Sequence, residues 1–121
     1  MYEIDFRRDI NLLDISWTGL FTPQAVRAYA ESLTDQFRWS GFRPGYRLRI
    51  DMSRSAIQTQ DALAAFRQQF TGFPVASKIA IVTPSALARL QVRREMQQSY
   101  LRLYDSADPA LDWFAEKAPI I

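Results

Sequence analysis

Residues 49 to 63, RIDMSRSAIQTQDAL, pass from a strand-like segment through a polar turn into a segment with helical character. The preceding residues belong to the same strand, in which apolar side chains alternate with polar ones: Tyr46, Leu48, Ile50 and Met52 against Arg47, Arg49 and Asp51. This alternation predicts a strand with one face toward water. Thr59 is a suitable N-cap for a helix that carries Leu63, Phe66 and Phe70.

The segments on either side extend this strand-turn-helix unit. Residues 2–7 and 10–18 alternate in the same way and predict an antiparallel hairpin linked at Arg8 and Asp9. Thr22-Pro23 predicts a helix to about residue 37, with a proline at its first position. Residues 78–82, KIAIV, are the best candidate for a central strand, and residues 100–104 predict a fifth strand.

Two further helices are expected between and after these strands. Thr83-Pro84 predicts a helix to about residue 98, and Asp108-Pro109 predicts a last helix. Helical spacing assigns inward-facing side chains to each of them. These are Ala86, Leu87, Leu90 and Met96 in the first, and Ala110, Leu111, Phe114 and Ala118 in the second.

The order of these elements predicts an α/β fold of α+β-like character. An antiparallel hairpin opens a mixed β-sheet, and β-α-β crossovers complete it. We expect the helices to lie mainly on one face of the sheet. We also expect residues 1–121 to form one domain, since the chain has no internal repeat and no low-complexity linker.

The composition excludes several classes of function. The chain contains no cysteine and no histidine, so disulfides, thiolate metal sites, cysteine nucleophiles and the commonest general base are absent. Asp51 with Asp61 could form a metal or acid–base pair, but neither a paired-carboxylate spacing nor a glycine-rich phosphate loop accompanies them. We therefore expect no enzyme activity, no cofactor and no metal.

The net charge and the length of the apolar segments bear on two questions, whether the partner is a nucleic acid and whether the chain enters a membrane. Lys and Arg total 15 against 13 for Asp and Glu, which leaves a net charge of only +2. This excess is weak support for a nucleic-acid partner. No stretch approaches the roughly 18 uninterrupted apolar residues of a membrane span. We expect a cytoplasmic protein that does not insert into the membrane.

Four segments together resemble a STAS domain, the fold shared by anti-sigma-factor antagonists and the cytoplasmic tails of sulfate transporters. They are GLFTPQAV at 19–26, RLRIDMS at 47–53, KIAIVTP at 78–84 and LYDSADPALDWF at 103–114. The chain is most similar to the small stand-alone STAS-like proteins, many of which carry no assigned function. The resemblance covers nearly the whole chain and rests on a pattern of strands, caps and helices, not on a catalytic signature. It implies a non-enzymatic regulatory module that binds a protein partner.

Signalling members of that family carry a phosphorylatable Asp-Ser-Ser-Gly at the start of the helix after this strand. Following the family pattern from Asp51 onward places Thr59-Gln60-Asp61-Ala62 there. Asp61 then stands at the acceptor serine and Ala62 at the glycine, so the chain departs from the family where phosphorylation occurs. Thr59, Ser53 and Ser55 remain the candidate phosphorylation sites.

The turns after the third and fourth strands are the candidate partner-binding site, because ligands and partners gather at the carboxyl ends of parallel strands. The candidate residues are Asp51, Ser53, Ser55, Thr59, Gln60, Asp61, Thr83, Arg89 and Arg93. A purely structural interpretation stays open, in which Thr59 is a cap, Asp61 complements the helix dipole and the arginines form a solvated helix face.

The water-facing side of the sheet is a candidate dimer interface. Its residues are Arg47, Arg49, Tyr100, Arg102 and Tyr104, accompanied by Asp5 and Asp14. Arginines and tyrosines with balancing acids suit a self-complementary protein interface. The same acids repel phosphate groups, and the aromatic residues lack the RNP pattern of RNA-binding sheets, so no nucleic-acid partner is expected.

An alternative function is a small-molecule or lipid carrier with an apolar pocket between the helices and the sheet.

Overall fold

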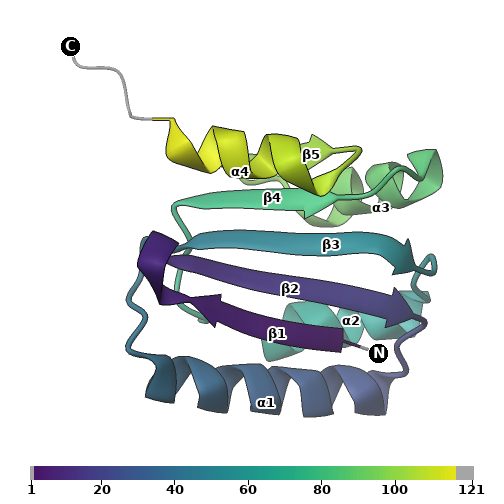
Figure 1. The fold of residues 1–121 in the computed structure, drawn as a ribbon. Coiled ribbons are helices and arrows are strands. Elements are labelled where there is room, and N and C mark those ends of the chain that lie inside the picture. Colours follow the sequence, from purple (N-terminus) through teal and green to yellow (C-terminus); the bar gives the residue numbers. More distant parts are fainter. Residues whose placement is uncertain (1, 117–121) are drawn as a thin grey trace.

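The computed structural model describes residues 2–116. The elements follow one another as β1 (Tyr2–Arg7), a 3-10 turn (Arg8–Ile10), β2 (Leu12–Gly19), α1 (Pro23–Ser40), β3 (Arg47–Ser55), α2 (Gln60–Gln69), β4 (Lys78–Val82), α3 (Ala86–Glu95), β5 (Leu101–Tyr104) and α4 (Ala107–Ala115). The predicted order of strands and helices is therefore confirmed (Figure 1).

The five strands form one mixed sheet in the order β1-β2-β3-β4-β5. The β1–β2 pair is antiparallel and places Tyr2 opposite Trp17 and Phe6 opposite Leu13, so the apolar faces of the two strands coincide. Each later pair is parallel. In β4, Ile79, Ala80, Ile81 and Val82 are all buried, which confirms its central character.

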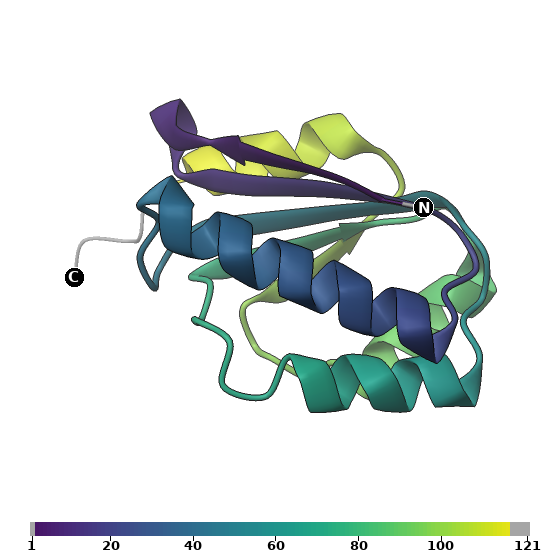
Figure 2. The ribbon, with the colours of Figure 1, turned by 90° about the horizontal axis from the view of Figure 1, so that it is seen from below.

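The helices form two layers of unequal size. Figure 2 shows α1, α2 and α3 on one side of the sheet and α4 on the other. Two apolar clusters correspond to these layers. The larger lies under α1 and α2 and is rich in aromatic contacts, such as the stacking of Trp17 on Phe66 with ring centroids 4.8 Å apart. The smaller consists of Leu12, Ala80, Ala110, Trp113 and Phe114 under α4.

Helix α1 follows the sequence prediction closely. The Thr22 Oγ1 atom accepts a hydrogen bond from the Ala25 N–H at 3.1 Å, and Pro23 occupies the first turn. The helix ends at Ser40, three residues later than expected, where Gly41 adopts a left-handed φ of 79°. Glycine takes this conformation without the steric cost that a Cβ atom imposes.

The β1–β2 connection and the last helix differ in detail from the prediction. The expected strand 10–18 begins only at Leu12, because Arg8–Ile10 form a 3-10 turn and Asn11 follows in a left-handed conformation with φ 52°. Helix α4 begins at Ala107 with Ser106 before it, so Pro109 lies inside the first turn. Of its expected inward residues, Ala110 and Phe114 are buried, and Ala118 lies outside the described residues.

Candidate functional site

The carboxyl edge of the parallel strands is the candidate site. There the β2–α1, β3–α2, β4–α3 and β5–α4 connections lie side by side (Figure 1). The strand β3 runs further into this edge than expected, since Ser55 pairs with Gly19 after an irregularity between Ser16 and Thr18. Ser53 and Ser55 are therefore strand residues and not turn residues.

Gln58 organises this edge and was missed by the sequence interpretation. Its side chain is buried, with an exposed fraction of 4% for the residue. The Gln58 Oε1 atom accepts a hydrogen bond from Phe21 N at 2.9 Å, and Nε2 donates to Gly19 O at 3.2 Å and to Ala56 O at 2.9 Å. One amide thus joins the β2–α1 and β3–α2 connections. A single glutamine before an N-cap carries no sequence signal of such a role.

The start of α2 presents two of the predicted residues to solvent. Thr59 is the N-cap, and its Oγ1 atom accepts from Ala62 N at 3.1 Å. Gln60 and Asp61 are exposed in the first turn. Asp61 also lies where a negative charge complements the helix dipole.

The other β3 candidates make local contacts. The Asp51 Oδ1 atom accepts a hydrogen bond from Ser53 N at 2.9 Å. The Ser55 hydroxyl accepts from Gln58 Nε2 at 2.9 Å and donates to Ala56 O at 3.1 Å. Because these bonds hold Ser55 inward, it is a poor phosphorylation site, whereas Ser53 and Thr59 are exposed.

The β4–α3 turn differs from the prediction. Ser85 caps α3, with its Oγ atom accepting from Ala88 N at 3.2 Å, so Thr83 is not the N-cap. Thr83 is only 1% exposed, and its Oγ1 atom accepts from Ser85 N at 3.2 Å. A partner therefore cannot reach Thr83, and the prediction that it binds one is wrong. Thr83 belongs to the β4 end because its N–H still donates to Tyr104 O at 2.9 Å.

Arg89 and Arg93 have different surroundings. The Arg89 Nε atom donates to Thr83 O at 3.1 Å, and its guanidinium forms an ion pair with Asp105. Arg89 therefore connects α3 to the β5–α4 turn. Arg93 lies one turn further along α3 and is exposed.

The outer side of α3 carries two exposed leucines beside Arg93 and Arg94, which reverses the prediction for this helix. Leu87 and Leu90 were expected inward but are 67% and 59% exposed, whereas Ala88 and Val92 are buried. The error arose because the stripe was assigned from the most apolar residues, whereas the packing of α3 turns the face with the smaller side chains of Ala88 and Val92 inward. Leu20 of the β2–α1 connection and Ile57 of the β3–α2 connection are large apolar residues that are exposed as well.

These apolar residues lie on connected backbone. Leu20 stands between Gly19 and Phe21, and Gln58 binds the backbone of both. Ile57 directly precedes Gln58, which Gln91 in turn joins to α3. We call Leu20, Ile57, Leu87 and Leu90 the apolar edge.

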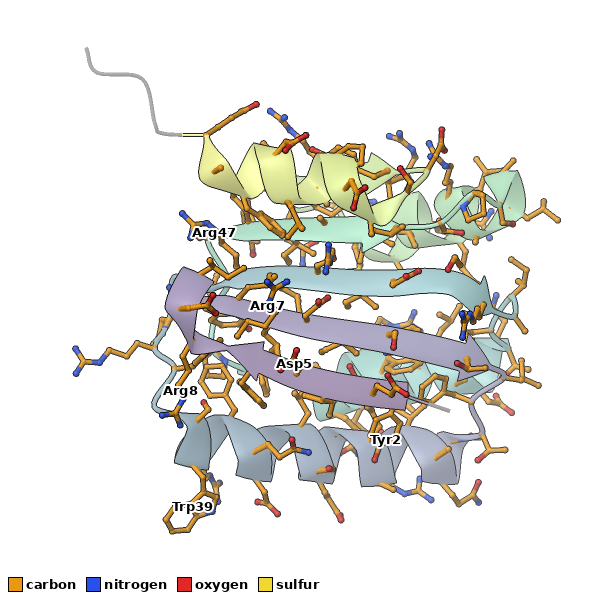
Figure 3. All side chains as sticks on the ribbon, viewed as in Figure 1. Tyr2, Asp5, Arg7, Arg8, Trp39 and Arg47 are labelled. Atoms are coloured by element: carbon orange, nitrogen blue, oxygen red, sulfur yellow. The ribbon has the colours of Figure 1, made fainter. Side chains whose placement is uncertain are left out.

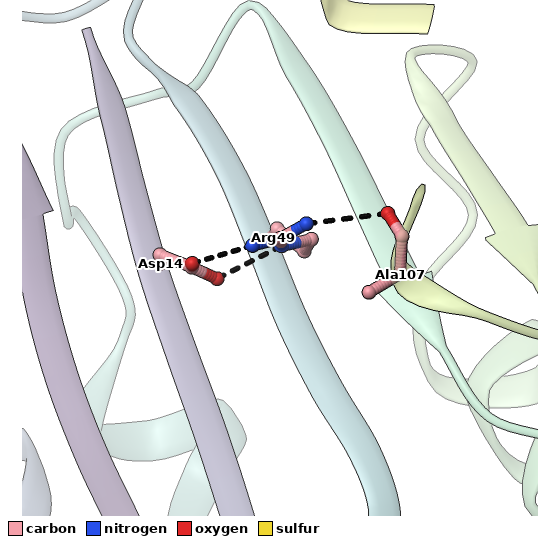
Figure 4. A network of polar contacts seen from close by, with 3 residues as sticks. All are labelled: Asp14, Arg49 and Ala107. Carbon is pink, nitrogen blue, oxygen red and sulfur yellow. Dashed lines mark hydrogen bonds and ion pairs between the residues drawn. The ribbon is translucent and has the colours of Figure 1, made fainter. Parts of the chain in front are cut away.

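The opposite face of the sheet is not open as predicted. Arg49 is buried beneath α4, where its guanidinium binds both carboxylate oxygens of Asp14 at 2.9 and 2.6 Å (Figure 4). A third bond runs from Arg49 Nη1 to Ala107 O at 3.2 Å, at the start of α4. The bond to the Asp14 side chain raises the pKa of Arg49, so the guanidinium stays charged. The assignment of Arg49 to an exposed dimer face is wrong.

Helix α4 also contacts Arg102 and Tyr104 of the predicted dimer face, of which Arg102 stays exposed and Tyr104 is half-buried. The Arg102 guanidinium lies 4.6 Å from the Trp113 ring centroid, and Tyr104 packs near the same ring. Tyr100 precedes β5 and does not follow its alternation, so it lies against the larger cluster on the other face. Arg47 donates to Ile10 O at 3.1 Å at the margin of the sheet. Figure 3 shows Asp5, Arg7 and Arg47 on the part of this face that α4 leaves uncovered.

A cavity of about 480 Å³ lies between the sheet, α2 and α3. Its floor consists of Leu13, Ile15, Leu48, Ile50, Met52, Ile79 and Ile81, and its walls include Trp17, Phe66, Phe70 and Val92. Polar side chains occur where α2 and α3 approach each other. Gln58 and Gln91 stand near one end of the two helices, and Arg67 and Glu95 form an ion pair near the other.

Within residues 2–116, no cluster of three or more acidic side chains could hold a metal ion. Asp51 and Asp61 do not form the pair considered from the sequence, since Asp51 binds Ser53 N and Asp61 projects into solvent at the start of α2. No helix in the same part of the chain is long and apolar enough to cross a membrane.

Comparison with known proteins addresses the fold. No family model and no curated protein matches the chain. An uncharacterized DUF3478-family protein with a SpoIIAA-like fold, from Shewanella loihica PV-4, matches with a TM-score of 0.71 at 16% identity, over 94% of this chain and 92% of that one. The anti-sigma factor antagonist SpoIIAA in its unphosphorylated form matches with a TM-score of 0.61 at 9% identity, over 93% and 96%. The fold is SpoIIAA-like. The STAS-like fold expected from the sequence is confirmed, and identities this low concern the fold alone.

Proposed function

We propose that the chain is a non-enzymatic regulatory module that binds a protein partner through the connections after β3 and β4. The observation that carries the proposal is the apolar edge. Large exposed apolar side chains cost solvation free energy unless a partner covers them. Four of them lie on three adjacent segments at the edge where partners of open α/β sheets bind.

The surroundings of the apolar edge resemble a protein interface in composition. Gln60 and Asp61 are exposed at the start of α2, and Arg93 is exposed on α3. An apolar centre with a polar, charged rim is the usual arrangement in such interfaces. Acidic and basic rim residues also favour one orientation of the partner over others.

The edge is held in place before a partner arrives. Gln58 joins the β2–α1 and β3–α2 connections, and Arg89 joins α3 to Asp105. A preformed surface loses less conformational entropy on binding, which raises affinity for a given contact area. The fold similarity to an anti-sigma factor antagonist supports the same class of function.

Self-association and phosphorylation remain predictions. Of the predicted dimer face, Asp5 and Arg102 are exposed and Arg47 is half-buried, so a second copy can still reach these three residues. Sedimentation equilibrium of the wild type and of Arg47→Glu tests a homodimer through that face.

Thr59 and Ser53 carry exposed hydroxyl groups that a kinase can reach. We expect the protein to work in the cytoplasm.

The test of partner binding uses substitutions that do not disturb the fold. Asp61→Ala and Arg93→Ala remove exposed side chains, so the free energy of unfolding should stay within about 0.5 kcal/mol of the wild type. Each should reduce recovery of the partner from a lysate of the native host, measured by quantitative mass spectrometry. Unchanged recovery with both variants would contradict the proposed surface.

A further inference from the structure

The cavity under α2 and α3 is partly open to solvent and is larger than the gaps that normal packing leaves. Protein interiors are close-packed, with few voids larger than a water molecule. Here Leu48, near the start of β3, is only partly buried because it faces this space, as are Phe66 and Phe70 above it. A volume of about 480 Å³ falls within the range of small-molecule sites, about 300–1,000 Å³.

The roof of the cavity is joined mainly by polar contacts. Helix α3 buries only Ala88 and Val92. Between the helices, Gln91 binds the backbone of Gln58 at one end, and Glu95 pairs with Arg67 at the other. Exposed ion pairs contribute little to stability, so α2 and α3 can separate at that end at small cost. This provides a route by which a small molecule can enter.

The charge on the cavity wall is balanced. Arg67 and Glu95 are the charged residues among those described that line it, and they neutralise each other. A charged ligand would therefore meet no free counter-charge in an apolar space, which is unfavourable. An uncharged ligand meets no such penalty.

One wall residue offers a hydrogen-bond donor that the fold uses poorly. The Trp17 Nε1 atom is buried and makes no well-aligned hydrogen bond within residues 2–116. Its N–H interacts with the Tyr29 hydroxyl, whose pKa is raised by burial, only closely enough to oppose that rise in part. The indole ring is held in place by stacking on Phe66 and by edge contact with Tyr29 at 5.9 Å. A buried N–H without a well-aligned acceptor is rare in proteins and costs free energy, and an oxygen atom of a ligand in the cavity would supply such an acceptor.

We propose that the cavity binds an uncharged apolar molecule that carries an oxygen acceptor, such as a long-chain ketone or ester. The apolar floor holds the hydrocarbon part, and the Trp17 N–H donates to the oxygen. The Arg67–Glu95 pair excludes fatty-acid anions, because a carboxylate would have to displace Glu95 from Arg67. This site is separate from the apolar edge, so it does not depend on the protein-binding function.

The test is displacement of the uncharged dye N-phenylnaphthylamine by two ligands of matched chain length. Methyl nonyl ketone should displace the dye, and undecanoate should do so at least about tenfold more weakly. Glu95→Gln frees Arg67 and should bring undecanoate close to the ketone. Trp17→Phe should weaken the ketone by about tenfold while the dye, which has no oxygen, binds as before.

A cavity-filling variant tests the location. Leu48→Phe adds volume inside the cavity and should abolish dye binding, whereas Leu87→Phe adds the same volume outside it and should leave binding unchanged. Circular dichroism verifies that both variants fold. Absence of dye binding to the wild type, equal affinity for ketone and undecanoate, or full binding by a folded Leu48→Phe protein would each overturn the proposal.

Discussion

Gln91 joins helix α3 to the β3–α2 connection by two hydrogen bonds to the backbone of Gln58. Its Oε1 atom accepts from Gln58 N at 3.2 Å, and its Nε2 atom donates to Gln58 O at 2.9 Å. The Gln58 side chain then binds the β2–α1 connection. Two glutamines thus align the three segments that carry the apolar edge.

The first prediction concerns Gln58. Gln58→Leu leaves the buried Phe21 N–H without an acceptor, whereas Gly19 O keeps the Ala56 N–H and Ala56 O keeps the Ser55 hydroxyl. An unpaired buried group costs about 1–3 kcal/mol, so the free energy of unfolding should fall by about 1–3 kcal/mol. Urea denaturation measures this loss. Gln60→Leu, at an exposed position, should change it by less than about 0.5 kcal/mol.

The second prediction concerns the N-cap of α2. Thr59→Ala removes the acceptor of Ala62 N and should lower the free energy of unfolding by about 1 kcal/mol. Thr59→Asp keeps a capping oxygen and should retain the stability of the wild type. Thermal denaturation of both variants checks this, and equal stability of the alanine and aspartate variants would show that the cap is unimportant.

The third prediction concerns the ion pair beneath α4. Arg49→Met leaves Asp14 and the Ala107 carbonyl without their partner, and the free energy of unfolding should fall by about 2–4 kcal/mol. The loss is smaller than for a fully buried pair because the Asp14 side chain keeps 21% exposure. Asp14→Leu combined with Arg49→Met should recover most of it. A double variant no more stable than the single one would contradict this account.

The fourth prediction concerns two buried tyrosines. Burial raises the pKa of Tyr29 and of Tyr46 above the usual value of 10.0, and Tyr46 also donates its hydroxyl hydrogen to Pro74 O at 2.7 Å. In the unfolded chain both phenols ionise near pH 10, so their protonated forms stabilise the fold fully below that pH. As the pH rises above about 10, stability should fall by about 1.4 kcal/mol per pH unit for each tyrosine.

Comparison of Tyr29→Phe with the wild type isolates this effect. The variant cannot ionise at that position, so its stability should fall less steeply between about pH 10 and 11 in urea titrations. Parallel pH profiles of the two proteins would mean that Tyr29 ionises as readily in the folded as in the unfolded state.

Local patterns in the sequence predicted the fold because the alternation of apolar residues and the helix caps indicate the same order of strands and helices. Alternation placed the strands, and Thr22-Pro23 and Thr59 marked two helix starts that the structure confirms. The start of α3 was misplaced, because both Thr83 and Ser85 can cap a helix and only the burial of Thr83 in the β4 end decides between them. The exposure of Leu87 and Leu90 has another cause, because the buried face of α3 carries Ala88 and Val92 and is not the most apolar face of the helix.

The remaining differences arise from tertiary contacts that a local pattern does not contain. The alternation of β3 placed Arg49 on the correct face of the sheet, opposite the larger apolar cluster. That face is not open to water at Arg49, because α4 packs across it and buries the side chain. The structural role of Gln58 depends on the backbone of Gly19 and Phe21, almost forty positions earlier. The cavity beneath α2 and α3 depends on how large side chains from several strands and helices fit together.

The most direct test of the proposed function is site-specific photocrosslinking in the native host. A photoreactive phenylalanine analogue replaces Ile57, Leu90 or, as the control, Trp39. Trp39 is 86% exposed at the end of α1 and points away from the apolar edge (Figure 3). The account predicts that positions 57 and 90 crosslink to the same protein and that position 39 does not. Crosslinking of that protein from position 39 with equal yield, or no shared protein at positions 57 and 90, would contradict it.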